Sequence, residues 1–265
     1  MDVNVIYNSE CRLGLKCLPE NSVNCCITSP PYYGLRDYGN DEQIGLEATP
    51  EEYIGKLVEV FREVRRVLTN DGTLWVNIGD SYAGSMKGAA QFPDNAMNYK
   101  QGTNRGALGK ATLVKQCTNC KPKDLIGIPW MLAFALRADG WYLRQDIIWS
   151  KPNPMPESVR DRCTKSHEYI FLLSKSRLYY FDADAIKVPA RESTMRRIRQ
   201  DVDNQVGSSR TLKANGNMKA VIGGRKRNFS DMTEDDPMYR ASTNREYEYT
   251  DKANKRSVWV VSASA

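Results

Sequence analysis

Apolar residues recur along the first 185 positions with two alternating periods, and this pattern predicts strands that alternate with helices. The clearest helix begins after Thr49, because Thr-Pro-Glu-Glu is a capping box with proline at the first helical position. Apolar residues then recur at helical spacing as far as Leu68, and Asn70-Asp71-Gly72 is expected to end the helix. Other segments predict a short helix at 13–18, a helix at 129–140 and strands at 3–7, 23–27, 73–78, 141–149, 169–173, 179–181 and 257–261.

The order of these elements predicts the class of fold. Strands that alternate with helices along a chain are typical of α/β proteins, so we expect a mostly parallel sheet with helices on both faces. Residues 79–122 are rich in Gly, Asn and Lys and show no sustained period, which predicts a long loop. Residues 187–256 are polar and also lack apolar periodicity, which predicts an insertion before the last strand.

Composition and targeting signals favour a folded protein of the cytoplasm. Hydrophobic residues make up 41% of the chain and charged residues 26%, which excludes the collagen-like and disordered classes. No apolar run reaches the roughly 18 residues of a membrane helix, and residues 1–4 show no sign of a secretion signal. The seven cysteines are irregularly spaced, as expected of free thiols in a reducing compartment. We therefore predict a cytoplasmic location and no membrane partner.

The excess of positive charge is confined to one segment. Residues 187–256 carry 16 Lys and Arg against 10 Asp and Glu, so the whole net charge of +6 lies there. A basic block of this kind predicts a polyanion partner such as nucleic acid. A solvated polar insertion is the alternative that charge by itself leaves open.

The segment Ser29-Pro30-Pro31-Tyr32 follows almost directly on the apolar strand predicted at 23–27. Two prolines at the carboxyl end of a strand fix the backbone and remove two N–H donors, so their carbonyls are expected to remain free as acceptors. Ligands of open α/β sheets bind at this edge. A hydroxyl, rigid carbonyls and an aromatic ring suit a planar amine such as a nucleobase amino group. The alternative is an ordinary proline-rich turn.

The chain resembles the amino-DNA methyltransferases in the permuted arrangement, whose catalytic half precedes the cofactor half. The family motif (Asp/Ser)-Pro-Pro-(Tyr/Phe) corresponds to Ser29-Pro30-Pro31-Tyr32, and the resemblance extends in order over residues 1–186. It rests on the blocks at 8–24, 72–77, 146–154 and 165–171. The resemblance implies a Rossmann-like α/β sheet, S-adenosylmethionine as cofactor, double-stranded DNA as partner, and Ser29, Pro30, Pro31 and Tyr32 as catalytic residues.

The resemblance also assigns roles to residues outside the motif. Lys151 and Asn153 lie in the block that approaches the target base, although an exposed loop is the alternative. The family carries its target-recognition region where this chain has residues 187–256, so Arg225 and Arg227 are expected to contact DNA. It thus implies a catalytic domain at 1–186, a target-recognition region at 187–256, and the start of a return strand at 257–265.

The motif suits methyl transfer from a sulfonium to an exocyclic amine, which is an in-line displacement that depends on positioning. The Ser29 hydroxyl and the Pro30 carbonyl are expected to hold the two N–H bonds and to stabilise the positive charge that develops on nitrogen. Tyr32 is expected to stack on the extruded base. Serine at the first motif position resembles the group specific for cytosine N4, with adenine N6 as the alternative. No proline precedes a cysteine, which argues against the C5-cytosine branch.

Two further sets of residues allow more than one interpretation. Cys117, Cys120, Cys163 and His167 have a spacing compatible with zinc, but free thiols are the default, and we predict no metal site. Asp80 is expected either to orient substrate or cofactor or to cap a turn or helix.

The cofactor half of the family is not found in this sequence. Its signature, an Asp-Pro-Phe-type strand followed by a Gly-x-Gly turn, is expected after residues 258–261 and does not occur up to Ala265. Thr28 and Asn8 are the remaining cofactor-binding candidates. We therefore expect residues beyond Ala265 or a second chain to complete this half; a catalytically incomplete DNA-binding relic or subunit is the alternative. A restriction-modification role in a bacterium or phage follows from the resemblance.

Overall fold

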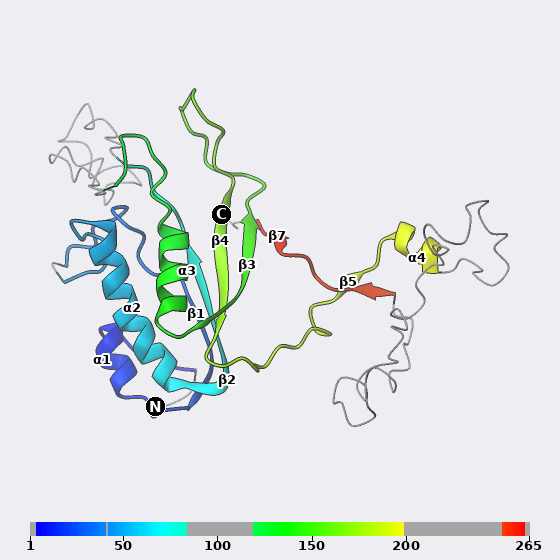
Figure 1. Ribbon diagram of the computed structural model, residues 1–265, viewed down its shortest axis with the longest axis horizontal. Helices are drawn as coiled ribbons and strands as arrows, with labels where there is room; N and C mark the ends of the chain where they lie inside the picture. The colour runs from blue at the N-terminus through cyan, green and yellow to red at the C-terminus, as the bar shows by residue number, and fades with distance from the viewer. Residues whose placement is uncertain (1–3, 41, 84–118, 199–250, 263–265) are drawn as a thin grey trace, which may run out of the picture. The chain divides into compact units, whose positions relative to one another are not determined.

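The computed structural model describes residues 4–40, 42–83, 119–198 and 251–262 (Figure 1). The chain forms two compact units. One consists of residues 1–181 and 256–265, and the other consists of residues 182–255. The helices and strands of the first unit are α1 (Cys11–Lys16), β1 (Val23–Thr28), α2 (Pro50–Val67), β2 (Leu68–Ile78), α3 (Ile128–Ala138), β3 (Tyr142–Ser150), β4 (His167–Ser174) and β7 (Val258–Val260). Those of the second unit are β5 (Val188–Pro189), α4 (Glu192–Ile198) and β6 (Lys252–Ala253).

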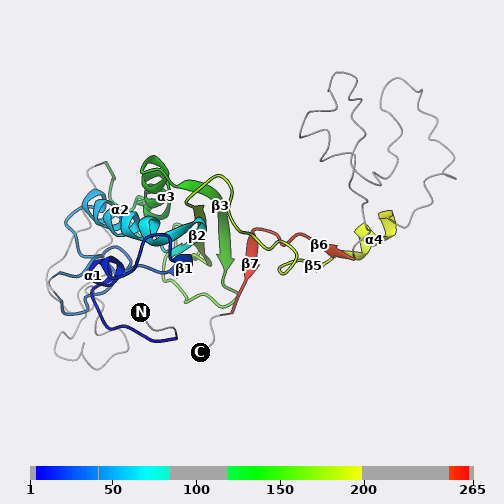
Figure 2. The ribbon, with the colours of Figure 1, turned by 90° about the horizontal axis from the view of Figure 1, so that it is seen from below.

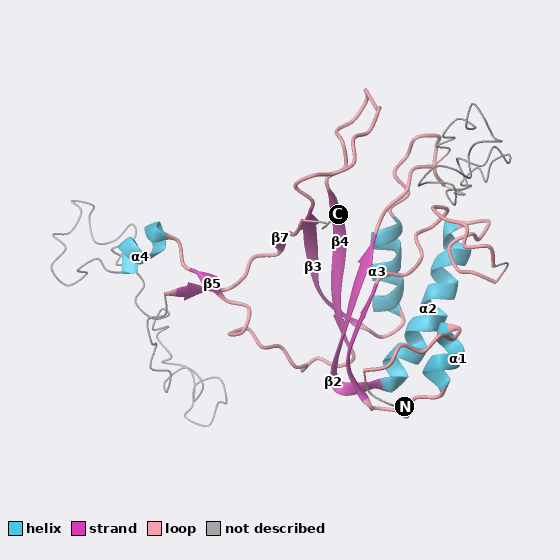
Figure 3. Ribbon diagram, turned by 180° about the vertical axis from the view of Figure 1, so that it is seen from behind, coloured by secondary structure: helices cyan, strands magenta, loops and turns pink. Residues whose placement is uncertain are grey.

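A five-stranded mixed sheet in the order β1-β2-β4-β3-β7 forms the centre of the first unit (Figure 3). β1 runs parallel to β2 and β3 runs parallel to β7, whereas β4 is antiparallel to both of its neighbours. The α/β class is confirmed, but the prediction of a mostly parallel sheet is wrong. The connection at 151–166 contains no helix, and strands joined without a crossover pair antiparallel, so β3 and β4 form a long hairpin.

Helix α2 follows the sequence prediction closely. The Thr49 hydroxyl accepts a hydrogen bond from the Glu52 amide at 3.2 Å, which confirms the N-terminal half of the capping box. Its buried face, which includes Tyr53, Leu57 and Phe61, packs into one core with the apolar residues of β2, β4 and α3. The helix predicted at 129–140 is also confirmed as α3, and the short one at 13–18 overlaps α1.

Helices α2 and α3 lie on the same side of the sheet (Figure 2). Leu74, Val76 and Ile78 of β2 point into the core that the helices form, and each is almost completely buried. Ile27 of β1 lies opposite Trp75 in the register and is 81% exposed, so it faces the other side. Within the described residues no helix covers this side, and the prediction of helices on both faces is therefore not met there.

The predicted stop at residues 70–72 is a bulge inside β2 rather than a break between helix and strand. β2 begins at Leu68 directly after α2, and the register advances from Val23–Leu68 to Cys25–Thr73. A Cβ atom at Gly72 would lie 3.0 Å from the Thr69 carbonyl oxygen and 3.2 Å from the Asn24 carbonyl oxygen. The bulge therefore favours glycine, because a Cβ atom would press on the backbone of both strands.

Two predicted strands are absent from the described structure. Residues 4–8 form a turn and coil in which Ile6 is 97% exposed, and they form no ladder with a described strand. Residues 179–181 are also coil: the Tyr180 amide donates to the Asp71 carbonyl at 3.0 Å, and the Arg144 guanidinium lies 5.3 Å from the centre of the Tyr179 ring. The aromatic run is thus held by single contacts rather than by a strand ladder.

The second unit is described only at its two ends. β5 and β6 pair antiparallel, with Val188 opposite Ala253 and Pro189 opposite Lys252. Helix α4 carries an exposed ion pair between Arg196 and Glu192 at 3.6 Å. Across the described parts of the whole chain, no helix combines the length and apolarity that a bilayer crossing needs.

Candidate active site

Ser29-Pro30-Pro31-Tyr32 leaves the sheet at the carboxyl end of β1, as the sequence predicts. Pro30 is buried, whereas the other three residues remain partly or largely exposed. The Tyr53 hydroxyl of α2 donates to the Pro31 carbonyl at 2.8 Å, so the expectation that both proline carbonyls are free is wrong for Pro31. The Pro30 carbonyl accepts no hydrogen bond from the described residues, and it is the acceptor that the motif leaves open.

Tyr32 is fixed at its ring and at its hydroxyl. A Cβ atom at Gly79 would come within 2.5 Å of ring atom Cε2, so the ring packs directly on the backbone where β2 ends. The hydroxyl lies 2.8 Å from Glu168 Oε2 of β4 and 3.0 Å from Asn77 Oδ1 of β2. Burial and the neighbouring Glu168 carboxylate raise the pKa of the Tyr32 phenol, so it remains protonated and donates.

The Glu168 carboxylate joins Tyr32 to Lys151. One carboxylate oxygen accepts from the Tyr32 hydroxyl, and the other pairs with Lys151 Nζ at the end of β3. Burial raises the pKa of Glu168, but the hydrogen bonds from Lys151 and Tyr32 outweigh it and the net shift is downward. Lys151 Nζ also lies 5.1 Å from the centre of the Trp149 ring. In this structure Lys151 therefore forms an ion pair with a carboxylate. It is not a free cation available to bind substrate.

Asn77 links the first motif residue to the same network. Its Oδ1 accepts from the Ser29 hydroxyl at 3.5 Å and lies 3.0 Å from the Tyr32 hydroxyl, and its Nδ2 donates to the Tyr169 carbonyl at 3.1 Å. Asn77 and Glu168 lie inside the blocks at 72–77 and 165–171, but their positions in the sequence predicted no role for either. The available signal was a polar residue within or at the start of an otherwise apolar strand.

Asp80 caps helix α3. Its Oδ1 accepts from the backbone amides of Gly127 and Ile128, each at 3.0 Å, and from Ser81 at 2.8 Å. A carboxylate at a helix N-terminus is favourable because it pairs with unsatisfied amides and with the helix dipole. The capping interpretation of Asp80 is therefore the one that the structure supports.

The other predicted site residues do not join this cluster. Asn153 is exposed after β3, and Asn8 lies in exposed coil before α1; neither forms a hydrogen bond with a described residue. Thr28 is half-buried and its backbone pairs with Val76. Arg225 and Arg227 lie outside the described residues.

Cys117 of the zinc alternative also lies outside the described residues. Cys163 is exposed, and the His167 ring meets the Tyr169 ring edge-on with centroids 5.5 Å apart. Among the described side chains, no three potential metal ligands come together.

Comparison with known proteins identifies the family. Residues 23–259 match the DNA methylase family of N6 and N4 enzymes. The chain is 54% identical over 186 residues to the type II methyltransferase M.Cfr9I of Citrobacter freundii, covering 69% of this chain and 58% of that protein. It is 52% identical over 194 residues to M.SmaI of Serratia marcescens, covering 72% and 62%. The chain therefore belongs to the DNA methylase family.

The chain spans about three fifths of the length of these curated relatives. Among solved structures, it matches the cytosine-N4-specific PvuII DNA methyltransferase with a TM-score of 0.42 and 16% identity, over 64% of this chain and 48% of that one.

Proposed function

We propose that this chain contains the catalytic half of a permuted, S-adenosylmethionine-dependent methyltransferase that methylates the exocyclic N4 of cytosine in double-stranded DNA. The observation that carries the proposal is the position of Ser29–Tyr32 at the carboxyl end of β1, with Tyr32 held by Glu168 and the Pro30 carbonyl open. Membership of the DNA methylase family supports it, and the type II names of its relatives support a restriction-modification context.

Each motif residue has a different part in positioning the amine and its base. When bound, S-adenosylmethionine supplies an electrophilic methyl group on a sulfonium. The Ser29 hydroxyl donates toward Asn77, which leaves its lone pairs to accept one amine N–H, while the Pro30 carbonyl accepts the other. These acceptors weaken the conjugation of the nitrogen lone pair and stabilise the charge that develops on nitrogen. Tyr32 offers a ring of fixed orientation against which the extruded base stacks.

Mass spectrometry of nucleosides from DNA of cells that express the complete gene tests this proposal. We expect N4-methylcytosine, because serine stands at the first motif position. N6-methyladenine would replace the cytosine assignment by the adenine alternative. If neither modified base is detected, the result would favour a DNA-binding subunit or relic without activity of its own.

We infer that the described residues do not by themselves form a cofactor site. Thr28 and Asn8 share no contact that would make a cradle, and the Gly79 position at the end of β2 is filled by the Tyr32 ring. β1 pairs only with β2 among the described strands, so its other edge is open. Because long open edges are normally paired or covered, we propose that further strands, from the same gene or a second chain, complete the cofactor half there.

Isothermal calorimetry of residues 1–265 with S-adenosylmethionine is expected to show weak or undetectable binding. The physical reason is that the strand and glycine-rich turn that normally approach such a cofactor closely are not found in residues 1–265. The complete gene product serves as the positive control. Micromolar binding by residues 1–265 would contradict the proposal, and the segment before α1, around Asn8, would be the first place to look for the site.

The basic segment 187–256 is proposed as the DNA target-recognition region. If it contacts phosphates, the logarithm of DNA affinity should fall by about 0.9 for each tenfold rise in salt per phosphate neutralised. Replacing Arg225, Lys226 and Arg227 together with alanine should flatten that slope in binding titrations at several salt concentrations. Alanines at Arg12 and Lys16 of α1 are the control. An unchanged slope in the triple variant would return these residues to the solvated-insertion alternative.

A further inference from the structure

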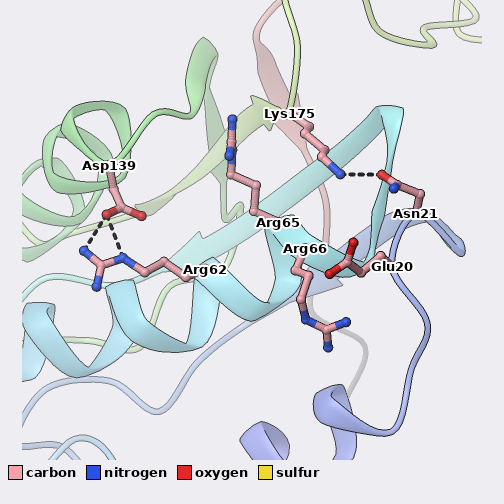
Figure 4. A pocket seen from close by; sticks show the side chains of 7 residues that line it. All are labelled: Glu20, Asn21, Arg62, Arg65, Arg66, Asp139 and Lys175. Carbon is pink, nitrogen blue, oxygen red and sulfur yellow. Dashed lines mark hydrogen bonds and ion pairs between the residues drawn. The ribbon is translucent and has the colours of Figure 1, made fainter.

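A second charged site lies at the end of the sheet where β1 begins, whereas Ser29–Tyr32 follows the end of that strand. A cavity of about 400 Å³ opens there, lined by the turn before β1, the last turns of α2, the residue after α3 and the residue after β4 (Figure 4). Segments that are distant in the sequence thus bring four cationic side chains and two carboxylates to one concave surface.

Two of the four cations are already neutralised. Arg62 donates to Asp139 Oδ1 through both Nε and Nη2, at 2.8 and 2.6 Å. Arg66 pairs with Glu63 at 2.9 Å and also donates to two backbone carbonyls. These two ion pairs neutralise Asp139, which follows α3, and the two arginines Arg62 and Arg66 near the end of α2.

The other two cations, Arg65 and Lys175, have no acidic partner among the described residues. Arg65 Nε is buried and makes no hydrogen bond. Lys175 Nζ is held only by neutral oxygens, Asn21 Oδ1 at 2.6 Å and the Leu68 carbonyl at 2.7 Å. Burial and then the charge of Arg65 lower the pKa of Lys175, an effect that Glu20 offsets only in part. A buried donor without a partner is costly, so this arrangement favours an added anion.

We propose that this cavity binds a phosphate-type oxyanion between Arg65 and Lys175. The guanidinium is a planar fork that suits two oxygens of such a group, and the ammonium adds a second charge. The backbone of Asn21 lies in the left-handed region, with a φ of 53°. Its Oδ1 accepts a hydrogen bond from Lys175, which leaves its Nδ2 as a neutral donor. A guanidinium, an ammonium and an amide among the residues that line one cavity match a tetrahedral oxyanion better than they match a single carboxylate.

Compensation of the α2 dipole is the competing account of these cations. Basic side chains stabilise helix C-termini, and Lys175 does donate to the carbonyl of Leu68, the residue that caps α2. That account explains Arg66 and Lys175, but it leaves the buried Nε of Arg65 without a partner. The two accounts therefore make different predictions for Arg65: the oxyanion proposal expects its guanidinium to respond when an anion is added, and dipole compensation expects no response.

Inorganic phosphate is the probe that separates them. In nuclear magnetic resonance titrations of residues 1–265 at constant ionic strength, phosphate should shift the Arg65 Nε–H resonance saturably, whereas chloride should not. In calorimetry, Arg65→Gln should weaken phosphate binding at least tenfold and Arg65→Lys less, because lysine keeps the charge and loses the fork. Lys16→Gln, on the exposed end of α1, removes the same charge elsewhere and should leave binding unchanged.

Absence of a saturable shift in the wild-type chain would overturn the proposal, as would equal weakening by Lys16→Gln. Thermal melting of each variant verifies folding, and the wild-type titration decides the question even if a variant is unstable. A short DNA duplex used as titrant identifies the source of the phosphate: a shift with duplex indicates a backbone phosphate, and a shift with inorganic phosphate only indicates a free phosphate group. The measurement requires no methyl transfer, so it stands apart from the proposed function.

Discussion

Alanine at position 32 is expected to lower kcat/KM of the complete methyltransferase by roughly tenfold to a hundredfold, as loss of a base-stacking contact of about 1–3 kcal/mol requires. The ring also packs on Gly79 and joins the edge of the core, so Tyr32→Ala should lower the free energy of unfolding as well. Methylation assays and denaturant melts of the same protein separate the two effects.

Phenylalanine at the same position is the matched control. Tyr32→Phe keeps the ring on Gly79 and removes only the hydroxyl that binds Glu168 and Asn77. It should retain more activity than Tyr32→Ala. Wild-type turnover in Tyr32→Ala would remove this tyrosine from the mechanism, whereas equal losses in both variants would assign the effect to the hydroxyl network rather than to stacking.

Removal of the Glu168 carboxylate is expected to give the second large effect. Glu168→Ala leaves Lys151 and the Tyr32 hydroxyl without their shared partner, so we expect a loss of about 2 kcal/mol in the free energy of unfolding and at least tenfold in kcat. Glu168→Gln keeps a neutral acceptor for Tyr32 and should recover part of kcat. The double variant Glu168→Gln, Lys151→Met removes both charges and should recover stability.

The pH dependence of these variants follows from the direction of the shift at Glu168. Its pKa is lowered in the folded protein, so the ionised carboxylate stabilises the fold above its usual value of 4.5 and the contribution is lost as pH falls through the folded value. Urea melts should therefore show the full difference between wild type and Glu168→Ala at pH 7, and a smaller one near pH 4. A difference that stays constant down to pH 3 would mean that the carboxylate charge contributes nothing.

Local signals account for the parts of the fold that the sequence predicted well. The capping box at Thr49, the helical period of α2 and the apolar strand before Ser29 each depend on residues within a few positions of one another. Such local preferences act before any tertiary contact forms, which is why the start of α2 and the exit of the motif from β1 could be read directly from the chain.

Tertiary structure alone decided the pairing of the strands and the support of the motif. The apolar strand β4 carries no mark of direction, and its antiparallel place between β2 and β3 follows from a connection without a helix. Tyr32 and Glu168 are 136 positions apart, and Tyr32 and Asn77 are 45 apart. The sequence by itself determined which residue types reach the site from β1. The partners that hold them come from other strands, and only the order of the sheet, set by burial and long-range hydrogen bonds, brings those partners together.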